Sequence, residues 1–314
     1  MELNYIILAY NKPLQLKRLV EKLQHPKAKF YIHIDKDSAI SQFKNSLEHL
    51  EITFLPDQKR FSGTWGDIGI VKASIEAIKL AFSENKKAYY ILLSGQDYPI
   101  KPVSQIFQYL EENYGTDYLT LYKLPHQNWE TGGIDRLTRY KVNKTGKRKH
   151  FLQLPSIFER EFYMVETLGK LNFLRKSKRY KEMKLVFRKR GFPKNLKPYG
   201  GSQWWCLTSE IINTILQFIN QNPDYLLYHQ YTLLPDEIFF HSIVGSLRET
   251  NNLKLARSLT YVNWERPSGP LPVTFKKEDF EELKEASKSH LFARKFDMEQ
   301  DAEILDEIDK RLLD

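Results

Sequence analysis

The stretch Ile91–Pro99, which reads Ile-Leu-Leu-Ser-Gly-Gln-Asp-Tyr-Pro, predicts a buried β-strand that ends abruptly in a polar turn. One carboxylate, Asp97, follows the apolar run, and Pro99 lacks the amide hydrogen that would continue a strand. In an α/β protein, ligands bind at the carboxyl ends of such strands. Many enzymes that use nucleotide-sugars have two acids at this place, which hold a metal against the diphosphate, whereas this chain has one. The stretch therefore predicts a sugar-nucleotide site in which another group neutralises the diphosphate.

Strands and helices alternate along the first half of the chain. The hydrophobic periodicity predicts strands at 3–9, 30–34, 52–55 and 89–93, and helices at 13–23, 70–82 and 103–114. This order is typical of an α/β fold with a mostly parallel, Rossmann-related sheet flanked by helices. Because the carboxyl ends of parallel strands share one edge, we expect residues at several strand ends to converge on one crevice. These residues are Ala9, Asn11, Asp35, Trp65 and Asp97.

The second half is less regular and is predicted to be rich in helices. The expected elements are a polar mobile loop at 124–150, a basic helix at 158–190, strands at 203–208 and 259–264, and an acidic helix after Phe296. Ser209 is predicted to cap a helix, and Pro235 to open another. No linker is evident, so we expect a single domain over 1–314. Residues 1–122 would form its nucleotide-binding half, and residues 123–314 its acceptor-binding and catalytic half.

The overall charge favours an anionic partner. The 314 residues carry a net charge of +9, and 41% of them are hydrophobic. Nucleic acid, an anionic bilayer and a phosphate-bearing substrate all fit this charge. No nucleic-acid-binding motif is recognisable, so no nucleic acid is expected. The sequence predicts a cytoplasmic protein. The lone cysteine, Cys206, excludes an internal disulfide, and the first strand begins so close to Met1 that no signal peptide is expected. The lack of a long apolar run predicts that no segment spans a membrane.

The positive charge is concentrated in Lys170–Arg190, which holds ten cations and one acid, Glu182. One interpretation is a solvated helix face. The other is a surface that docks on the anionic inner leaflet of a membrane and brings the protein to a lipid-linked substrate. The sequence leaves both interpretations open.

Two groups of acids are candidates for chemistry. Asp35 and Asp37 have a spacing that suits a hard divalent cation with oxygen ligands, although such pairs are common by chance. Asp236 and Glu237 follow Pro235 at an expected helix start beside aromatic residues. Such a position can desolvate a glutamate and tune it as a general base. The alternative for both residues is simple complementarity to the helix dipole.

Cations and tryptophans supply further candidates. Arg294 and Lys295 lie between two phenylalanines and could clamp a phosphate, or they could be exposed charges beside core residues. Trp204 and Trp205 are adjacent, so on a strand they face opposite ways. One of them is expected in the core, and the other could stack against a sugar.

Six segments together resemble the Core-2/I-branching β-1,6-N-acetylglucosaminyltransferase family, which includes the peptide O-xylosyltransferases. Each segment alone is weak evidence, but they occur in the family's order across nearly the whole chain. The segments are Tyr31-Ile32-His33-Ile34-Asp35-Lys36, Gly63-Thr64-Trp65-Gly66, Leu92–Pro99, Gly200-Gly201-Ser202-Gln203-Trp204-Trp205, Pro235–His241 and Leu291–Phe296.

The resemblance implies a GT-A-like fold and an inverting, metal-independent transfer of a sugar, GlcNAc or xylose, from a UDP-sugar to a hydroxyl. By this resemblance Glu237 is the catalytic base, and Arg294 and Lys295 neutralise the leaving diphosphate. The other implied roles are nucleoside binding by Ala9, Asn11, Asp35 and Trp65, further phosphate binding by Arg266, and contacts to donor sugar or acceptor by Asp97, Gln203, Trp204, Trp205 and Asp236. Asp97 would orient the sugar or fix the crevice loop.

The chain departs from the animal members of this family, which carry a membrane anchor and several disulfides. It therefore resembles a bacterial member that is cytoplasmic or peripheral at the inner face of the plasma membrane and that builds a surface polysaccharide or glycolipid. Two alternatives stand beside this hypothesis: a basic nucleic-acid-binding protein without catalysis, and a metal-dependent GT-A enzyme that uses Asp35 and Asp37.

Overall fold

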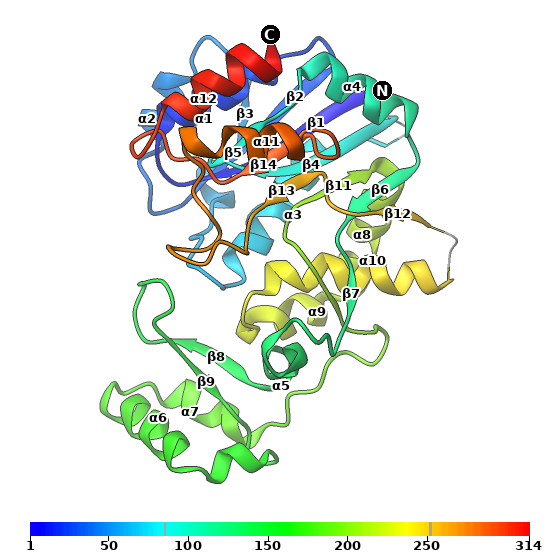
Figure 1. Ribbon diagram of the computed structural model, residues 1–314. Helices are drawn as coiled ribbons and strands as arrows, with labels where there is room; N and C mark the ends of the chain where they lie inside the picture. Colours follow the sequence, from blue (N-terminus) through cyan, green and yellow to red (C-terminus); the bar gives the residue numbers. More distant parts are fainter. Residues whose placement is uncertain (85, 251–252) are drawn as a thin grey trace.

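A seven-stranded mixed sheet forms the centre of the molecule (Figure 1). The computed structural model describes residues 1–84, 86–250 and 253–314. The sheet has the order β12-β6-β11-β4-β1-β2-β3. Its strands are β1 (Glu2–Ala9), β2 (Ala28–Ile34), β3 (Thr53–Phe54), β4 (Ala88–Ser94), β6 (Thr116–Leu119), β11 (Trp205–Thr208) and β12 (Lys254–Ala256).

Most neighbours in this sheet are parallel. β1 pairs in parallel with β2 and β4, β2 pairs in parallel with β3, and β12 pairs in parallel with β6. β11 is inserted between β4 and β6 and runs antiparallel to both. The predicted α/β fold with a mostly parallel sheet is therefore confirmed.

Helices cover both faces of the sheet and form three layers. One face packs against α1 (Pro13–Lys22), α4 (Val103–Glu112), α11 (Phe280–Ala286) and α12 (Glu303–Ile308). The other face packs against α3 (Gly69–Ala81), α8 (Ser209–Gln221) and α10 (Phe239–Thr250). Successive side chains of β1 point to opposite faces of the sheet, so both faces are apolar: Tyr5 and Ile7 pack in the cluster on the first face, and Ile6 packs in the cluster on the other. α2 (Ile40–Ser46) and α9 (Pro223–Tyr228) complete these layers.

A small second sheet joins the C-terminal part of the chain to the segment that follows β4. Its strands are β13 (Thr260–Val262), β14 (Phe292–Arg294) and β5 (Asp97–Pro99), with β14 in the middle. β14 and β5 are antiparallel, and their register places Arg294 opposite Asp97. This pairing joins two segments that lie 197 residues apart in the sequence.

A separate lobe lies at the end of the molecule opposite the sheet (Figure 1). It contains α5 (Ile134–Thr138), the hairpin of β8 (Tyr140–Asn143) and β9 (Phe151–Leu154), α6 (Val165–Lys176) and α7 (Tyr180–Met183). The lobe has its own small apolar cluster, which includes Leu154, Leu174 and Val186. The short pair of β7 (Tyr122–Lys123) and β10 (Tyr199–Gly200) connects it to the main body.

Three predictions for the second half were wrong. The expected loop at 124–150 contains α5, β8 and the hairpin turn. The expected basic helix is broken, because the backbone turns left-handed at Lys178, with φ 55°, between α6 and α7. Ser209 begins α8 instead of capping it, and its hydroxyl bonds the Lys86 carbonyl and the Ala88 amide of the β4 entry.

Candidate active site

The carboxyl ends of β1, β2 and β4 lie side by side. The amide of Asp35 donates to the carbonyl of Ala9 at 2.8 Å, and the amide of Gly95 donates to the carbonyl of Leu8 at 3.0 Å. Gly95 permits this close approach, since a Cβ there would lie 3.2 Å from the Cβ of Ala9. Asn11 follows, half-buried, on the loop after β1. The predicted strand ends thus border one edge of the sheet.

The carboxylate of Asp35 binds the backbone of the loop that contains Gly63 and Trp65. Its two carboxylate oxygens accept hydrogen bonds from the amides of Asp37, at 2.8 Å, and Gly63, at 2.6 Å. Asp37 in turn accepts from the hydroxyl of Ser62 at 2.7 Å. Among residues 1–84, 86–250 and 253–314, no group of three or more His, Cys, Asp or Glu side chains is arranged to hold a metal. Through their hydrogen bonds, the two aspartates hold the loop that carries Trp65.

Trp65 is half-buried between the main body and the lobe. Its ring lies 6.1 Å from that of Phe151, and the guanidinium of Arg148 lies 5.5 Å from it. The buried Lys141 donates to the carbonyl of Trp65 at 3.2 Å and pairs with Asp67. The β8–β9 hairpin therefore holds the Trp65 loop from the lobe side.

Asp97 is almost fully buried and pairs with Arg294. Its carboxylate accepts from the amide of Ser94 at 2.6 Å and from the guanidinium of Arg294 at 3.1 Å. Burial raises the pKa of Asp97, while Arg294 and the Ser94 bonds oppose this shift. The single acid after β4 is therefore the partner of the first cation of the Arg294–Lys295 pair.

The two adjacent tryptophans have different environments. Trp204 is buried beneath Arg294, whose guanidinium lies 4.0 Å from the centre of the indole ring. Trp205 points into the core, 5.4 Å from the ring of Phe240. The prediction that one tryptophan is core holds for Trp205, but Trp204 is buried in the same apolar cluster, so the expectation that the two residues face opposite ways is not met. Gln203 is half-buried beside them.

Lys295 and Arg266, the other predicted phosphate ligands, differ in their surroundings. Lys295 is half-buried, and burial together with Arg148 and Arg294 lowers its pKa. Three cations thus adjoin one another without an equal number of acids. Arg266 instead forms an ion pair with Asp279 at 2.5 Å, and a carboxylate of Glu282 lies at 3.7 Å. The predicted role of Arg266 in phosphate binding would require this ion pair to open.

Glu237 ends a short 3-10 turn, Pro235–Glu237, immediately before α10. The turn begins after Leu234, which is left-handed with φ 53° and whose amide donates to the carbonyl of Gly66 at 3.1 Å. The amide of Gly201 donates to the carbonyl of Glu237 at 3.0 Å. A Cβ at Gly201 would lie 1.8 Å from the carbonyl oxygen of Thr120, so only glycine fits there. The turn is held by the segments that carry Trp65 and Trp204.

The carboxylate of Glu237 pairs with Arg136 at 2.6 Å. Arg136 belongs to α5 of the lobe, and its guanidinium stacks 4.1 Å from the ring centre of Trp129. Burial raises the pKa of Glu237, and the charge of Arg136 and its hydrogen bond lower it again. Sequence reasoning missed Arg136, because it lies in the stretch expected to be a loop.

Asp236 is buried next to Glu237, with 6% of its surface exposed. Within the part of the chain that the structure describes, its Oδ1 has no hydrogen-bond partner. Burial, and then the neighbouring charge of Glu237, raise the pKa of Asp236 to about 7. Both carboxyls of this pair therefore have raised pKa values.

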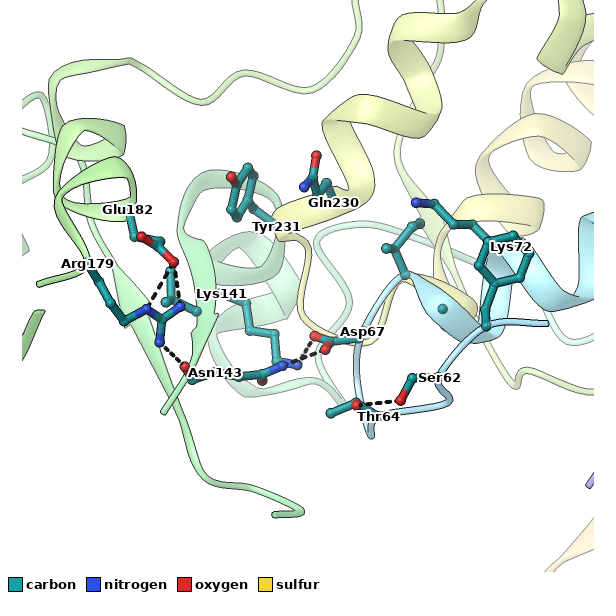
Figure 2. Close-up of a pocket in the computed structure, with 14 residues that line it drawn as sticks. Ser62, Thr64, Asp67, Lys72, Lys141, Asn143, Arg179, Glu182, Gln230 and Tyr231 are labelled. Carbon is teal, nitrogen blue, oxygen red and sulfur yellow. Dashed lines mark hydrogen bonds and ion pairs between the residues drawn. The ribbon is translucent and has the colours of Figure 1, made fainter. Parts of the chain in front are cut away.

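A polar crevice of about 420 Å³ opens between the Trp65 loop and the lobe (Figure 2). Figure 2 shows the ammonium of Lys141 directed at Asp67, and Arg179 paired with Glu182 at 2.7 Å on the opposite side. Asn143 also donates to Asp67, at 2.5 Å. The walls therefore offer both hydrogen-bond donors and acceptors.

The sequence matches the family model described as Branch: Core-2/I-Branching enzyme over residues 3–286. The chain belongs to the Core-2/I-branching enzyme family. This is a family of glycosyltransferases, so the expected enzyme class is confirmed. Xylosyltransferase 2 of Mus musculus is 26% identical over 336 residues, which cover 98% of this chain and 33% of the relative. Xylosyltransferase 1 of Canis lupus familiaris is 24% identical over 322 residues, covering 94% of this chain and 29% of the relative.

The chain thus spans about a third of the length of these relatives. A crystal structure of mouse xyloside xylosyltransferase 1 in its apo form aligns over 93% of this chain and 97% of that one. Its TM-score is 0.34 at 10% identity, so this likeness carries no argument about the site. None of the described helices has the length and apolar character needed to cross a membrane.

The six segments of the family resemblance are linked by direct contacts. Asp35 bonds Gly63, Gly66 bonds Leu234, Glu237 bonds Gly201, and Trp204 stacks with Arg294, which pairs with Asp97. In a member of the Core-2/I-branching family, these contacts connect the segment that carries Glu237 with the segments that carry Asp97 and Arg294.

Proposed function

We propose that this chain is an inverting, metal-independent glycosyltransferase with a GT-A-like fold. Its donor would be a UDP-sugar, with GlcNAc or xylose the favoured sugars, and its acceptor a hydroxyl of a glycan or glycolipid of the kind used for surface polysaccharides. The observation that carries the proposal is the contact chain from Glu237 through Gly201 and Trp204 to Arg294. A carboxylate base and a cation cluster on one surface are what such a transfer needs.

The leaving diphosphate would be neutralised by Arg294 and Lys295, with Arg148 as a third cation. Arg294 is preorganised by Asp97 on one side and by the face of Trp204 on the other. A guanidinium fixed in this way presents its remaining N–H groups to a phosphate without a further loss of side-chain freedom. Asp97 would then act by holding Arg294, and not by holding a metal.

Glu237 would be the general base. It would take the proton of the acceptor hydroxyl while that oxygen forms a bond to the anomeric carbon and the bond from this carbon to the diphosphate breaks. Attack opposite the leaving group inverts the configuration. Arg136 would keep Glu237 ionised and aimed, since the guanidinium is 2.6 Å from the carboxylate and itself rests on Trp129. Arg136 is therefore proposed as a positioning residue for the base.

The nucleoside would lie over the strand ends, against Ala9, Asn11, Asp35 and Trp65. Both oxygens of Asp35 already accept amide hydrogens, so its contribution would be the shape of the loop. The polar crevice beside Trp65 is proposed to receive the part of the acceptor beyond the attacked sugar. Its mixture of donors and acceptors suits carbohydrate hydroxyls.

A panel of UDP-sugars tests this proposal. Thermal shift should identify a UDP-sugar that stabilises the protein in EDTA as well as in manganese. Release of UDP from this donor should depend on an added acceptor. The Arg294→Gln variant should lose the shift, while Arg266→Gln should retain it, because Arg266 is paired with Asp279. A shift that disappears in EDTA and returns with manganese would overturn the metal-free mechanism.

A further inference from the structure

Exposed apolar side chains gather on one part of the lobe. Tyr163, Val165 and Leu168 are 76%, 80% and 64% exposed, and Phe158 and Phe187 are 63% and 66% exposed. The segments that carry Phe158 and Phe187 lie against each other, because the amide of residue 157 donates to the carbonyl of residue 186. The hydroxyl of Tyr163 donates to the same residue 157. Exposure of neighbouring large apolar residues is unusual for a surface that faces only water.

Exposed cations surround this patch. Of the ten cations in the basic segment, Arg190 is buried and bonds backbone carbonyls, Lys170 is half-buried and bonds the carbonyl of Gln153, and Arg179 pairs with Glu182. The remaining seven are exposed: Arg175, Lys176, Lys178, Lys181, Lys184, Arg188 and Lys189. The acids of the described residues 158–189 with exposed side chains are Glu166 and Glu161, and Glu161 pairs with Arg139. The face therefore has a strong positive excess.

We infer that this face of the lobe, residues 158–189, binds an anionic lipid surface. Apolar side chains can enter the boundary between headgroups and acyl chains, while the surrounding lysines and arginines meet lipid phosphates. A protein partner is less consistent with the face, because lysine is depleted at protein interfaces. This inference goes beyond the proposed transfer reaction and does not depend on it. It places the catalytic surface near acceptors that are carried by lipids.

Sedimentation with vesicles tests the inference. The full chain should bind vesicles of phosphatidylcholine mixed with phosphatidylglycerol and should bind pure phosphatidylcholine far more weakly. Each cation that meets the surface contributes about a fivefold change in partitioning, so Lys181→Ser with Lys184→Ser should weaken binding roughly 25-fold. Val165→Ser with Leu168→Ser should weaken it as well. The matched control, Lys284→Ser in α11 with Lys288→Ser just after this helix, removes the same charge at two exposed side chains and should change binding by less than about twofold.

Circular dichroism and thermal melting would establish that all three double variants are folded. Equal partitioning onto the two kinds of vesicle would overturn the inference, as would equal losses for the lobe and control variants. Competition by inorganic phosphate at a concentration equal to that of the lipid phosphate would point to a simple anion site instead. A dimer that Val165→Ser with Leu168→Ser dissociates, without vesicle binding by the parent chain, would assign the face to a second copy.

Discussion

Replacement of Arg136 by glutamine should shift the pH dependence of transfer. The guanidinium and the Glu237 carboxylate are 2.6 Å apart between N and O, so their charge centres lie about 4 Å apart. At an effective dielectric constant of 20 this separation corresponds to about 4 kcal/mol. The side chains retain 18% and 26% exposure, so solvent reduces the effect to roughly 1.5–3 kcal/mol. Such a loss raises the pKa of Glu237, and 1.4 kcal/mol corresponds to about a tenfold change in proton affinity.

The direction of the shift follows from the role of the base. Glu237 must be ionised to accept a proton, so activity falls as the pH drops through its pKa. In Arg136→Gln the acid limb of the kcat profile should move to higher pH by about one to two units, with activity recovering at alkaline pH. Arg139→Gln is the matched control, since Arg139 is a neighbouring arginine that pairs with Glu159 and Glu161. An unmoved limb in Arg136→Gln, or an equal shift in the control, would refute the reasoning.

Three further predictions concern the frame of the site. Asp97→Asn should weaken UDP binding in calorimetry at least about tenfold, because Arg294 loses the partner that fixes it; unchanged affinity would contradict this. Gly201→Ala should lower stability by about 1–3 kcal/mol or more in chemical denaturation, since its Cβ would meet a backbone carbonyl at 1.8 Å; a wild-type midpoint would contradict the geometry. For Asp236→Asn, the free energy of unfolding should rise relative to that of the wild type as the pH increases from about 4 to above 7, and the difference should reach up to about 4 kcal/mol. Burial raises the pKa of Asp236 to about 7, so the wild type loses stability across that window, and parallel stability curves would count against the burial argument.

The first half of the fold was predictable because local signals and tertiary structure agree there. β1, β2 and β4 are apolar runs that end in polar turns, and the chain order alone implies that their ends share an edge. Strand geometry was misleading at Trp204 and Trp205, because β11 begins only at Trp205 and both side chains belong to one buried cluster. Strand geometry also cannot predict the contact between the guanidinium of Arg294 and the ring of Trp204. This contact depends on the pairing of β14 with β5, which no local sequence pattern encodes.

Arg136 and Arg266 show where sequence reasoning ends. Arg136 reaches Glu237 from 101 residues away, through a turn with positive φ at Thr131, Gly132 and Gly133, and a polar basic stretch gives no sign of this. Arg266 resembles a phosphate ligand in sequence, but Asp279 holds it in space. In both cases the decisive contact is an ion pair, 101 residues away for Arg136 and 13 residues away for Arg266, and the identity of a cation does not reveal its partner.

The role of Glu237 is the central claim, and Glu237→Gln tests it most directly. This variant keeps the size of the side chain and can still bond Arg136, but it cannot accept the acceptor proton. Transfer should fall by at least about a hundredfold, while calorimetry should show UDP binding within about threefold of wild type, since 1 kcal/mol of affinity corresponds to about fivefold. Full turnover by Glu237→Gln with normal UDP binding would remove Glu237 as the base and contradict the account.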